Sequence, residues 1–262
     1  MAKPFVNPFV SGQLLELRVD ALVSDGRGLG RHDGVVVLVE DALPGQLVRA
    51  RVAAVRKSLA EAALVEVLER SPDEQEPPCP HAGRCGGCSW QSLAYGRQLA
   101  WKERIVHDAL ERVGKVACPP MLPILPSPSE WGYRNKMEFA FGVSGDGGKA
   151  LGLRERGSRN IVEVTGCLLQ TPLTMRVLEA VRMLSNGAFH DLDGRFLVVR
   201  EPNAGGCFVE LIVGAGGSLE AGERFAEALR AETPEVTGFA LSERLAPSDV
   251  AYGERALYAD GR

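Results

Sequence analysis

The sequence lacks any apolar run of membrane length, and its longest run, residues 35–39, is long enough only for a strand. Its first residues also lack the basic-then-apolar order of a secretory signal. We therefore expect a cytoplasmic protein that contacts no membrane. Hydrophobic residues make up 45% of the 262 residues and charged residues 24%, which excludes a disordered or fibrous chain. This length allows one large domain or two to three small ones.

The sequence also lacks an excess of positive charge. Its formal net charge of −4 argues against indiscriminate binding of nucleic acids, although a local basic face remains compatible with it. Six cysteines are present. In a reducing compartment such cysteines are thiols or metal ligands rather than disulfides, so their spacing carries the information.

Residues 13–70 carry the signals of a small all-β domain. Apolar and polar side chains alternate over residues 15–23, and further apolar runs lie at 35–39, 47–55 and 62–68. The three glycines of residues 25–30 predict a loop. About four or five short strands predict a closed, OB-like barrel at residues 10–71. The acidic, proline-rich residues 71–78 predict a linker.

The rest of the chain mixes helix and strand signals. Apolar residues recur at helical spacing over residues 89–113 and stop at Gly114, and five prolines in residues 118–129 predict an extended connector. Helices are predicted after Thr171-Pro172 and over residues 218–231. Strands are predicted at residues 137–143, 150–154, 160–164, 196–200, 207–213 and 236–241. Strands interspersed with helices predict an α+β domain at residues 118–262.

Three cysteines, Cys79, Cys85 and Cys88, lie within ten residues, with Gly86 and Gly87 between the last two. Thiolates are ligands of metals and clusters, and glycines let the backbone close round them, so the spacing predicts a metal site. The alternative is three thiols that only pack in the fold. Zinc sites usually have two separated ligand pairs, and the sequence shows one triplet. A 4Fe-4S cluster needs four thiolates, so Cys118, Cys167 or Cys207 would supply the fourth.

A locally basic stretch covers residues 131–160, with six basic and three acidic residues. Arginine and lysine neutralise phosphates, and tyrosine can stack on an unpaired base, which is how RNA loops are usually recognised. The candidate RNA-binding residues are Tyr133, Arg134, Lys136, Arg154, Arg156 and Arg159. Arg27 and Arg31 of the predicted barrel loop are weaker candidates. The alternative for the stretch is a solvated hairpin face.

Three motifs, in this order, resemble those of the RNA uracil-5-methyltransferase family: GRGLGR at residues 26–31, CPHAGRCGGCSWQ at 79–91 and GYRNKMEFAFG at 132–142. The resemblance covers nearly the whole chain. It implies a TRAM barrel, a central α+β domain that carries a 4Fe-4S cluster, and a stem-loop of ribosomal or transfer RNA as partner. It also implies Cys167 as the fourth ligand, because Cys167 opens the segment before a predicted helix.

The resemblance further implies a reaction. A cysteine thiolate attacks C6 of uracil, S-adenosylmethionine methylates C5, and a carboxylate removes the displaced proton. We recognise none of these groups, and no glycine-rich cofactor loop, before the sequence ends at Gly261-Arg262. The expectation is therefore the RNA-binding and iron–sulfur part of the enzyme, inactive alone. Its partner would be a C-terminal catalytic domain of the same polypeptide, on which residues 93–117 would dock. Residues 72–92 would form the linker and the cysteine triplet of the central domain.

Two alternatives stay open. Radical methylthiotransferases also combine a TRAM barrel with a cluster. The order of their domains is different, with the barrel last, and their Cys-x3-Cys-x2-Cys triplet is tighter. A stand-alone iron–sulfur RNA-binding module without a catalytic partner is the other.

Overall fold

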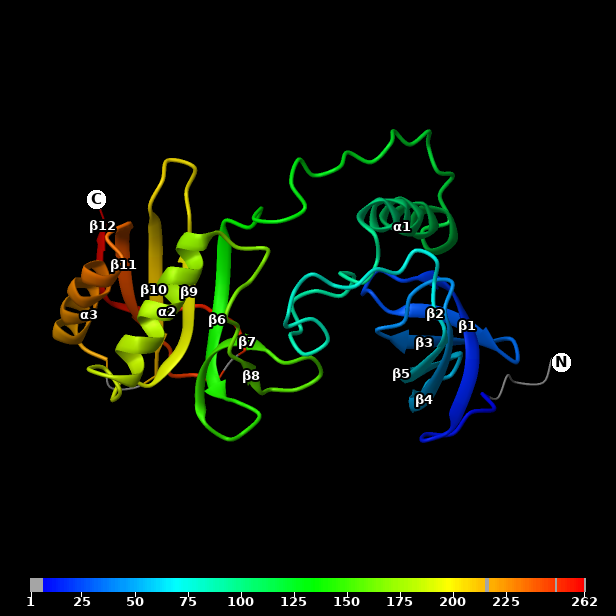
Figure 1. Ribbon diagram of the computed structural model, residues 1–262, viewed down its shortest axis with the longest axis horizontal. Coiled ribbons are helices and arrows are strands. Elements are labelled where there is room, and N and C mark those ends of the chain that lie inside the picture. Colours follow the sequence, from blue (N-terminus) through cyan, green and yellow to red (C-terminus); the bar gives the residue numbers. More distant parts are fainter. Residues whose placement is uncertain (1–6, 215–216, 248, 262) are drawn as a thin grey trace. The chain divides into compact units, whose positions relative to one another are not determined.

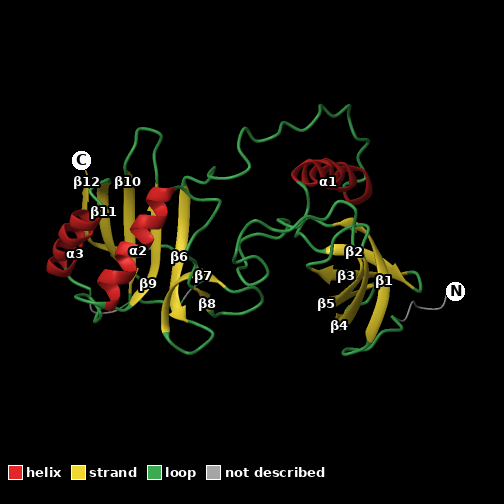
Figure 2. Cartoon of the chain, viewed as in Figure 1, coloured by secondary structure: helices red, strands yellow, loops and turns green. Residues whose placement is uncertain are grey.

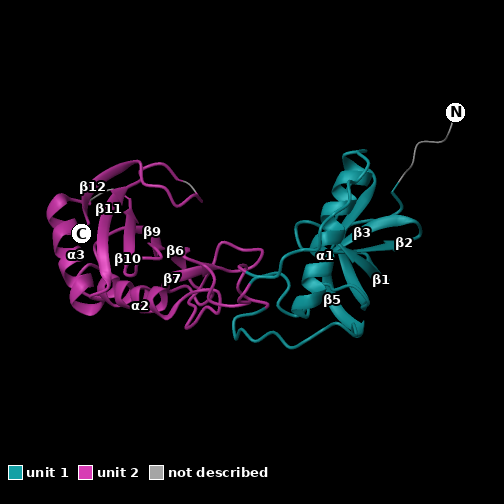
Figure 3. Cartoon of the chain, turned by 90° about the horizontal axis from the view of Figure 1, so that it is seen from above, with its two compact units in different colours: residues 1–82, 88–127 teal, residues 83–87, 128–262 magenta. Residues whose placement is uncertain are grey.

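The computed structural model describes residues 7–214, 217–247 and 249–261 (Figure 1). The chain forms two compact units, one of residues 1–82 and 88–127 and the other of residues 83–87 and 128–262 (Figure 3). We call them unit 1 and unit 2, and each has its own hydrophobic core. Over the ranges described, no helix has the length and apolar character needed to cross a membrane.

Unit 1 is built on a closed barrel, which confirms the predicted barrel of four or five strands. In the described residues its strands follow the order β1-β2-β3-β5-β4. Alternate residues of β1, such as Leu15, Leu17 and Val19, point into the core and are buried, as the sequence pattern predicted. The strands are β1 (Leu14–Leu22), β2 (Gly28–His32), β3 (Val35–Glu40), β4 (Leu47–Val55) and β5 (Leu59–Glu69).

Strand β2 corrects the prediction of a glycine loop over residues 25–30. Gly28 and Gly30 lie inside the strand and pair with β1 and β3. A Cβ on Gly30 would lie 2.3 Å from the Arg18 carbonyl oxygen, and one on Gly28 would lie 2.7 Å from that of Ala42. Both glycines therefore permit close approach of neighbouring backbone rather than a turn.

Helix α1 (Tyr95–Asp108) continues as a π-helical turn, η1 (Ala109–Val113), and belongs to unit 1. Trp101 is buried in a small cluster with Leu22, Leu43 and Leu93, at the barrel. Val106 and Val113 remain 50% and 82% exposed. The helix thus packs on the barrel through one face, where the sequence had suggested a helix docked on another domain, and keeps part of its apolar surface open.

Unit 2 contains a mixed sheet, of seven strands in the described residues, in the order β12-β11-β10-β9-β6-β7-β8. Helices α2 (Pro172–Asn186) and α3 (Leu219–Glu232) cover one face of it, and their apolar sides join the larger core (Figure 2). The strands are β6 (Lys136–Val143), β7 (Lys149–Arg154), β8 (Ile161–Val162), β9 (Gly194–Arg200), β10 (Cys207–Val213), β11 (Val236–Glu243) and β12 (Arg255–Gly261).

The connection β10-α3-β11 is a parallel crossover, whereas the other neighbouring strands of this sheet pair antiparallel. Helix α2 begins as predicted, because the Thr171 hydroxyl accepts a hydrogen bond from the Thr174 amide and Pro172 follows it. The interspersed helices and strands of the sequence are confirmed. The parallel crossover adds an α/β unit to the α+β arrangement, and β12 is a further strand that the sequence did not predict.

Candidate functional site

The predicted RNA-binding segment lies at the N-terminal end of helix α2. The Gly132 amide donates to the Leu168 carbonyl at 2.8 Å, and the Arg134 amide donates to the Leu169 carbonyl at 3.0 Å. Cys167 precedes this pair and closes a turn, with its carbonyl accepting from the Gln170 amide at 3.0 Å. The structure therefore brings Tyr133 and Arg134 next to the turn that contains Cys167.

Side chains of this segment form a small exposed surface. Tyr133 is 56% exposed, and Arg134 is exposed beside it. Lys136 pairs in register with Arg200 across β6 and β9, so both cations stand on the same side of the sheet. The Lys136 ammonium is engaged by Glu138, whereas in the described residues Arg200 has no ion-pair partner. We call Tyr133, Arg134, Lys136 and Arg200 the edge surface.

A carboxylate fixes the backbone behind the edge surface. Glu201 follows Arg200, and its amide donates to the Asn135 carbonyl at 2.8 Å. Its side chain accepts hydrogen bonds from the hydroxyls of Thr171 and Thr174 in the first turn of α2. Glu201 thereby joins the end of β9, the residues before β6 and the start of α2. This joint holds Tyr133 and Arg134 on a rigid part of unit 2.

The arginines at residues 154–159 lie on the hairpin of β7 and β8. Arg154 donates to the Arg159 carbonyl at 2.7 Å and pairs with Asp249 at 3.3 Å; Arg159 approaches the same carboxylate at 4.0 Å. Both ion pairs are exposed and worth little, so the two arginines stay available to a phosphate. The Arg156 amide donates to the Arg84 carbonyl at 2.8 Å.

The two arginines of the barrel differ. Arg27 donates a hydrogen bond from Nε to Asp25 at 2.9 Å and forms an ion pair with it, and Arg27 holds the pKa of Asp25 below its ordinary value. This side chain stabilises its own loop. Arg31 is exposed on β2 and, within the described part of the chain, has no ion-pair partner. Of the two candidates, Arg31 is the one free to contact RNA.

The cysteine triplet is divided between the two units. Cys85 belongs to unit 2, where its backbone bridges Glu155 and the neighbouring Gly86 amide donates to the Arg154 carbonyl at 3.0 Å. Cys79 and Cys88 belong to unit 1, and Cys167 to unit 2. All four thiols are partly exposed. In the ranges described, no three side chains of His, Cys, Asp or Glu are grouped so that they could hold a metal ion.

The remaining two cysteines have different surroundings. Cys207 is fully buried in the larger core of unit 2. Its burial raises the pKa of the thiol to about 11, so Cys207 stays protonated at neutral pH. Cys118 is partly exposed in the proline-rich connector.

Gln170, three residues after Cys167, is buried. Neither polar atom of its side-chain amide has a hydrogen-bond partner.

Known proteins are similar to both units of the chain. A TRAM domain model matches residues 8–65, which include β1 to β4. An RNA methyltransferase of Nitratidesulfovibrio vulgaris is 45% identical over 97% of this chain and 56% of its own length. A 23S rRNA (uracil(1939)-C(5))-methyltransferase of Acidithiobacillus ferrooxidans is 37% identical over 70% of this chain and 41% of its own length. The chain thus spans about half the length of these relatives or less.

A solved structure shares the fold. The crystal structure of a Pyrococcus abyssi tRNA (uracil-54, C5)-methyltransferase, in complex with S-adenosyl-L-homocysteine, superposes with a TM-score of 0.65. The likeness covers 94% of this chain and 55% of that chain, at 22% sequence identity. At this identity the comparison establishes the fold alone.

The comparisons correct one expectation from the sequence. We predicted a chain without the catalytic domain, inactive alone and partnered by that domain. Against this, 97% of the chain aligns with one RNA methyltransferase at 45% identity, and 70% of it aligns with a second one at 37% identity. We therefore withdraw the absence of the catalytic domain, the inactivity and the predicted partner domain. The chain carries a TRAM domain and is homologous to RNA methyltransferases.

Proposed function

We propose that the protein acts in the S-adenosylmethionine-dependent methylation of RNA at C5 of uracil. The observation that carries the proposal is the edge surface, because it joins an exposed aromatic ring to cations at the ends of two central strands, in a chain homologous to RNA methyltransferases. Ribosomal RNA is the favoured substrate class, since the relative of A. ferrooxidans, 37% identical, methylates 23S rRNA.

The edge surface suits a single-stranded or looped RNA. Arg134 and Arg200 offer guanidinium groups that can neutralise phosphates, and the Tyr133 ring can stack on an unpaired base between them. Arg31 on the barrel and Arg154 with Arg159 on the hairpin extend the set of cations available to the RNA. When bound, S-adenosylmethionine would supply the methyl group; we assign no residue of this chain to the nucleophile, the base or the methyl donor.

We also propose that Cys79, Cys85, Cys88 and Cys167 bind a 4Fe-4S cluster. The donor set fits such a cluster in number and in chemistry, because four thiolates are what it requires. All four thiols are partly exposed, in contrast to Cys207, whose burial disfavours the thiolate. The side-chain amide of Gln170, three residues after Cys167, is buried without a hydrogen-bond partner, so a polar group is present close to Cys167 in the sequence.

Deletion of the gene tests the methylation proposal. We expect 5-methyluridine to decrease in ribosomal RNA of the deletion strain, measured by nucleoside mass spectrometry on separated ribosomal and transfer RNA. A plasmid copy of the gene should restore it, and a copy with Tyr133→Ala should restore less. Loss confined to transfer RNA would contradict the ribosomal assignment. Unchanged 5-methyluridine in both fractions would contradict the function.

A further inference from the structure

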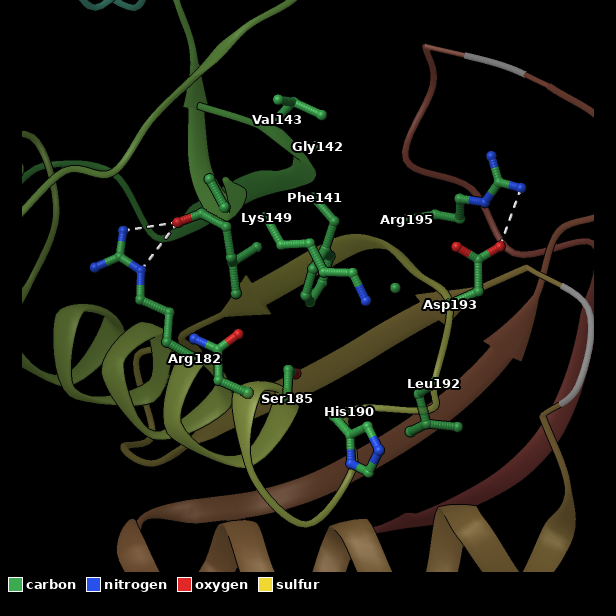
Figure 4. A pocket seen from close by; sticks show the side chains of 14 residues that line it. Phe141, Gly142, Val143, Lys149, Arg182, Ser185, His190, Leu192, Asp193 and Arg195 are labelled. Atoms are coloured by element: carbon green, nitrogen blue, oxygen red, sulfur yellow. Dashed lines mark hydrogen bonds and ion pairs between the residues drawn. The ribbon is translucent and has the colours of Figure 1, made fainter. Parts of the chain in front are cut away.

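Unit 2 also contains a basic cavity, and none of its lining residues belongs to the sites described above. Its volume is about 310 Å³, and it lies between the ends of β6 and β7, the last turn of α2 and the loop that leads into β9 (Figure 4). Three permanent cations, Lys149, Arg182 and Arg195, line it together with one carboxylate, Asp193. The cavity therefore carries an excess of positive charge in a protein whose net charge is negative.

The cations have different roles. Arg182 donates to the Leu151 carbonyl at 2.7 and 2.9 Å and to the Val164 carbonyl at 3.1 Å, so it fixes α2 to β7. Arg195 pairs with Asp193 at 3.2 Å. The Lys149 side chain extends into the cavity, and in the described residues its ammonium has no ion-pair partner (Figure 4). Lys149 is therefore the cation available to an anionic ligand, whereas Arg195 of β9 is engaged by Asp193 (Figure 4).

The other walls suit a larger group than a simple anion. Phe141, Val143 and Leu192 supply apolar surface, and Ser185 supplies a hydroxyl. Gly194 lies directly on the Phe141 ring, since a Cβ there would be 2.8 Å from its atoms, so the ring is fixed as a flat wall. A volume of about 300 Å³ is at the lower end of the volumes of small-ligand sites and far exceeds the volume of a phosphate ion.

Two carbonyl groups of the last turn of α2 are engaged within the turn. The Met183 and Leu184 carbonyls accept hydrogen bonds from Gly187, and Leu184 also accepts from Phe189. His190 is held by a contact of Nδ1 with the Gly187 carbonyl at 3.0 Å, which leaves its Nε2 directed away from that contact. Part of the negative end of the helix is thus satisfied within the turn.

We propose that this cavity binds one ribonucleotide, with the phosphate on Lys149 and the base against Phe141. The ribonucleotide can be a unit of the RNA strand, which rests on the proposed function, or a free nucleotide. The cavity and the edge surface lie at opposite ends of β6 and β9, on the order of 20 Å apart from the rise of a strand. The two sites can therefore be altered separately.

Titration of the isotope-labelled protein with uridine monophosphate, followed by NMR, tests the cavity. We expect saturable shifts of the amide signals of Gly142, Lys149 and Gly194. Lys149→Ala should weaken binding about tenfold, as loss of a charge-assisted hydrogen bond predicts, and Lys149→Arg should retain most of it. Lys102→Ala, on exposed α1, is the matched control and should change nothing. Near-ultraviolet circular dichroism checks that each variant is folded.

Several outcomes would overturn the proposal. Shifts confined to Tyr133 and Arg134, or equal binding by the Lys149→Ala variant, would place the nucleotide elsewhere. Inorganic phosphate that binds as tightly as uridine monophosphate would reduce the cavity to an anion site and exclude the base contact.

A single-stranded oligouridylate distinguishes the two sources of the nucleotide. Tighter binding than the mononucleotide, with the same cavity signals shifted, supports a unit of RNA. No shift by the oligonucleotide, with the mononucleotide response kept, contradicts the RNA version and supports a free nucleotide. Cavity shifts in a protein whose gene deletion leaves 5-methyluridine unchanged would support this inference while the proposed function fails.

Discussion

Asp260 is the carboxylate with the strongest local support in unit 2. Arg230 donates to it at 2.7 Å and through a second hydrogen bond, the Tyr258 hydroxyl donates at 2.6 Å, and the Phe239 amide donates at 3.1 Å. These donors, Arg230 foremost, hold the pKa of Asp260 well below its usual range. The side chain therefore joins α3, β11 and β12 as an ionised group.

The first prediction concerns the pH dependence of this joint. Because the pKa of Asp260 is lower in the folded than in the unfolded chain, its stabilisation is present above the unfolded pKa of about 3.9 and is lost as pH falls through the folded pKa. Asp260→Asn should therefore lower the free energy of unfolding by about 1–3 kcal/mol at pH 7, and by less near pH 3. Urea unfolding at both pH values measures the difference.

Asp249→Asn provides the control, because Asp249 forms exposed pairs with Arg154 and Arg159 and its substitution should cost less than about 1 kcal/mol. An equal loss of stability by Asp260→Asn at both pH values would show that shape, not charge, is the basis of the joint.

The second prediction at the residue scale concerns the cysteines. Protein purified without oxygen should be brown and contain about four irons per chain, as a cluster with four thiolates requires. Replacement of Cys79, Cys85, Cys88 or Cys167 by serine should each reduce iron content, measured by a colorimetric iron assay and absorbance. Cys207→Ser and Cys118→Ser are the controls and should retain iron. Zinc in place of iron would contradict the cluster, and iron loss in Cys118→Ser would replace Cys167 as the fourth ligand.

At the scale of elements, the sequence predicted most helices and strands from local periodicity, but not β2 and β12. Strand β2 was hidden because Gly28 and Gly30 are turn residues by composition, and only the packing of the barrel shows why glycine is required. Strand β12 is partly exposed and shows no clean alternation of buried residues. Its position depends on pairing with β11 and on the contact between Asp260 and Arg230. Both strands therefore depend on tertiary contacts, which the local sequence does not show.

Glycine substitutions test the packing explanation of β2. Gly30→Ala should destabilise unit 1 by about 1–3 kcal/mol, because its Cβ would meet the Arg18 carbonyl oxygen at 2.3 Å and force the backbones apart. Gly96→Ala is the matched control in α1, where a Cβ meets no atom within 4 Å in the described residues. That change should leave stability unchanged or raise it by up to about 1 kcal/mol. Thermal unfolding of both variants decides; similar effects would refute the packing explanation.

At the scale of the whole molecule, the candidate site divides into parts that sequence does and does not predict. Tyr133 and Arg134 are recognisable because they are neighbours in a basic stretch. Arg200 is not, because only the register of β6 against β9 sets it beside Lys136. The cavity around Lys149 also cannot be recognised in the sequence, since its walls come from four separate segments of the chain. Local composition thus predicts a binding segment, whereas topology adds the residues that complete the surface.

The edge surface leads to the last prediction. If Arg134 and Arg200 neutralise phosphates, the affinity of the chain for a uridine-containing stem-loop must fall as salt rises, because each neutralised phosphate releases counterions. The Arg134→Ala, Arg200→Ala double variant should bind more weakly, and its slope of log affinity against log salt should decrease by about 0.7 for each phosphate that the variant leaves without a cation. Fluorescence anisotropy with labelled RNA at several salt concentrations measures both quantities.

Tyr133 separates stacking from charge in the same assay. Tyr133→Ala should weaken binding about tenfold with the salt slope unchanged, since stacking on a base releases no counterions, whereas Tyr133→Phe keeps the ring and should bind almost as the parent does. Arg224→Ala, on exposed α3, removes a cation away from the edge surface and should change neither affinity nor slope. If the double variant kept the parent slope, or Arg224→Ala lowered it equally, the cations of the edge surface would be solvated groups that bind no RNA.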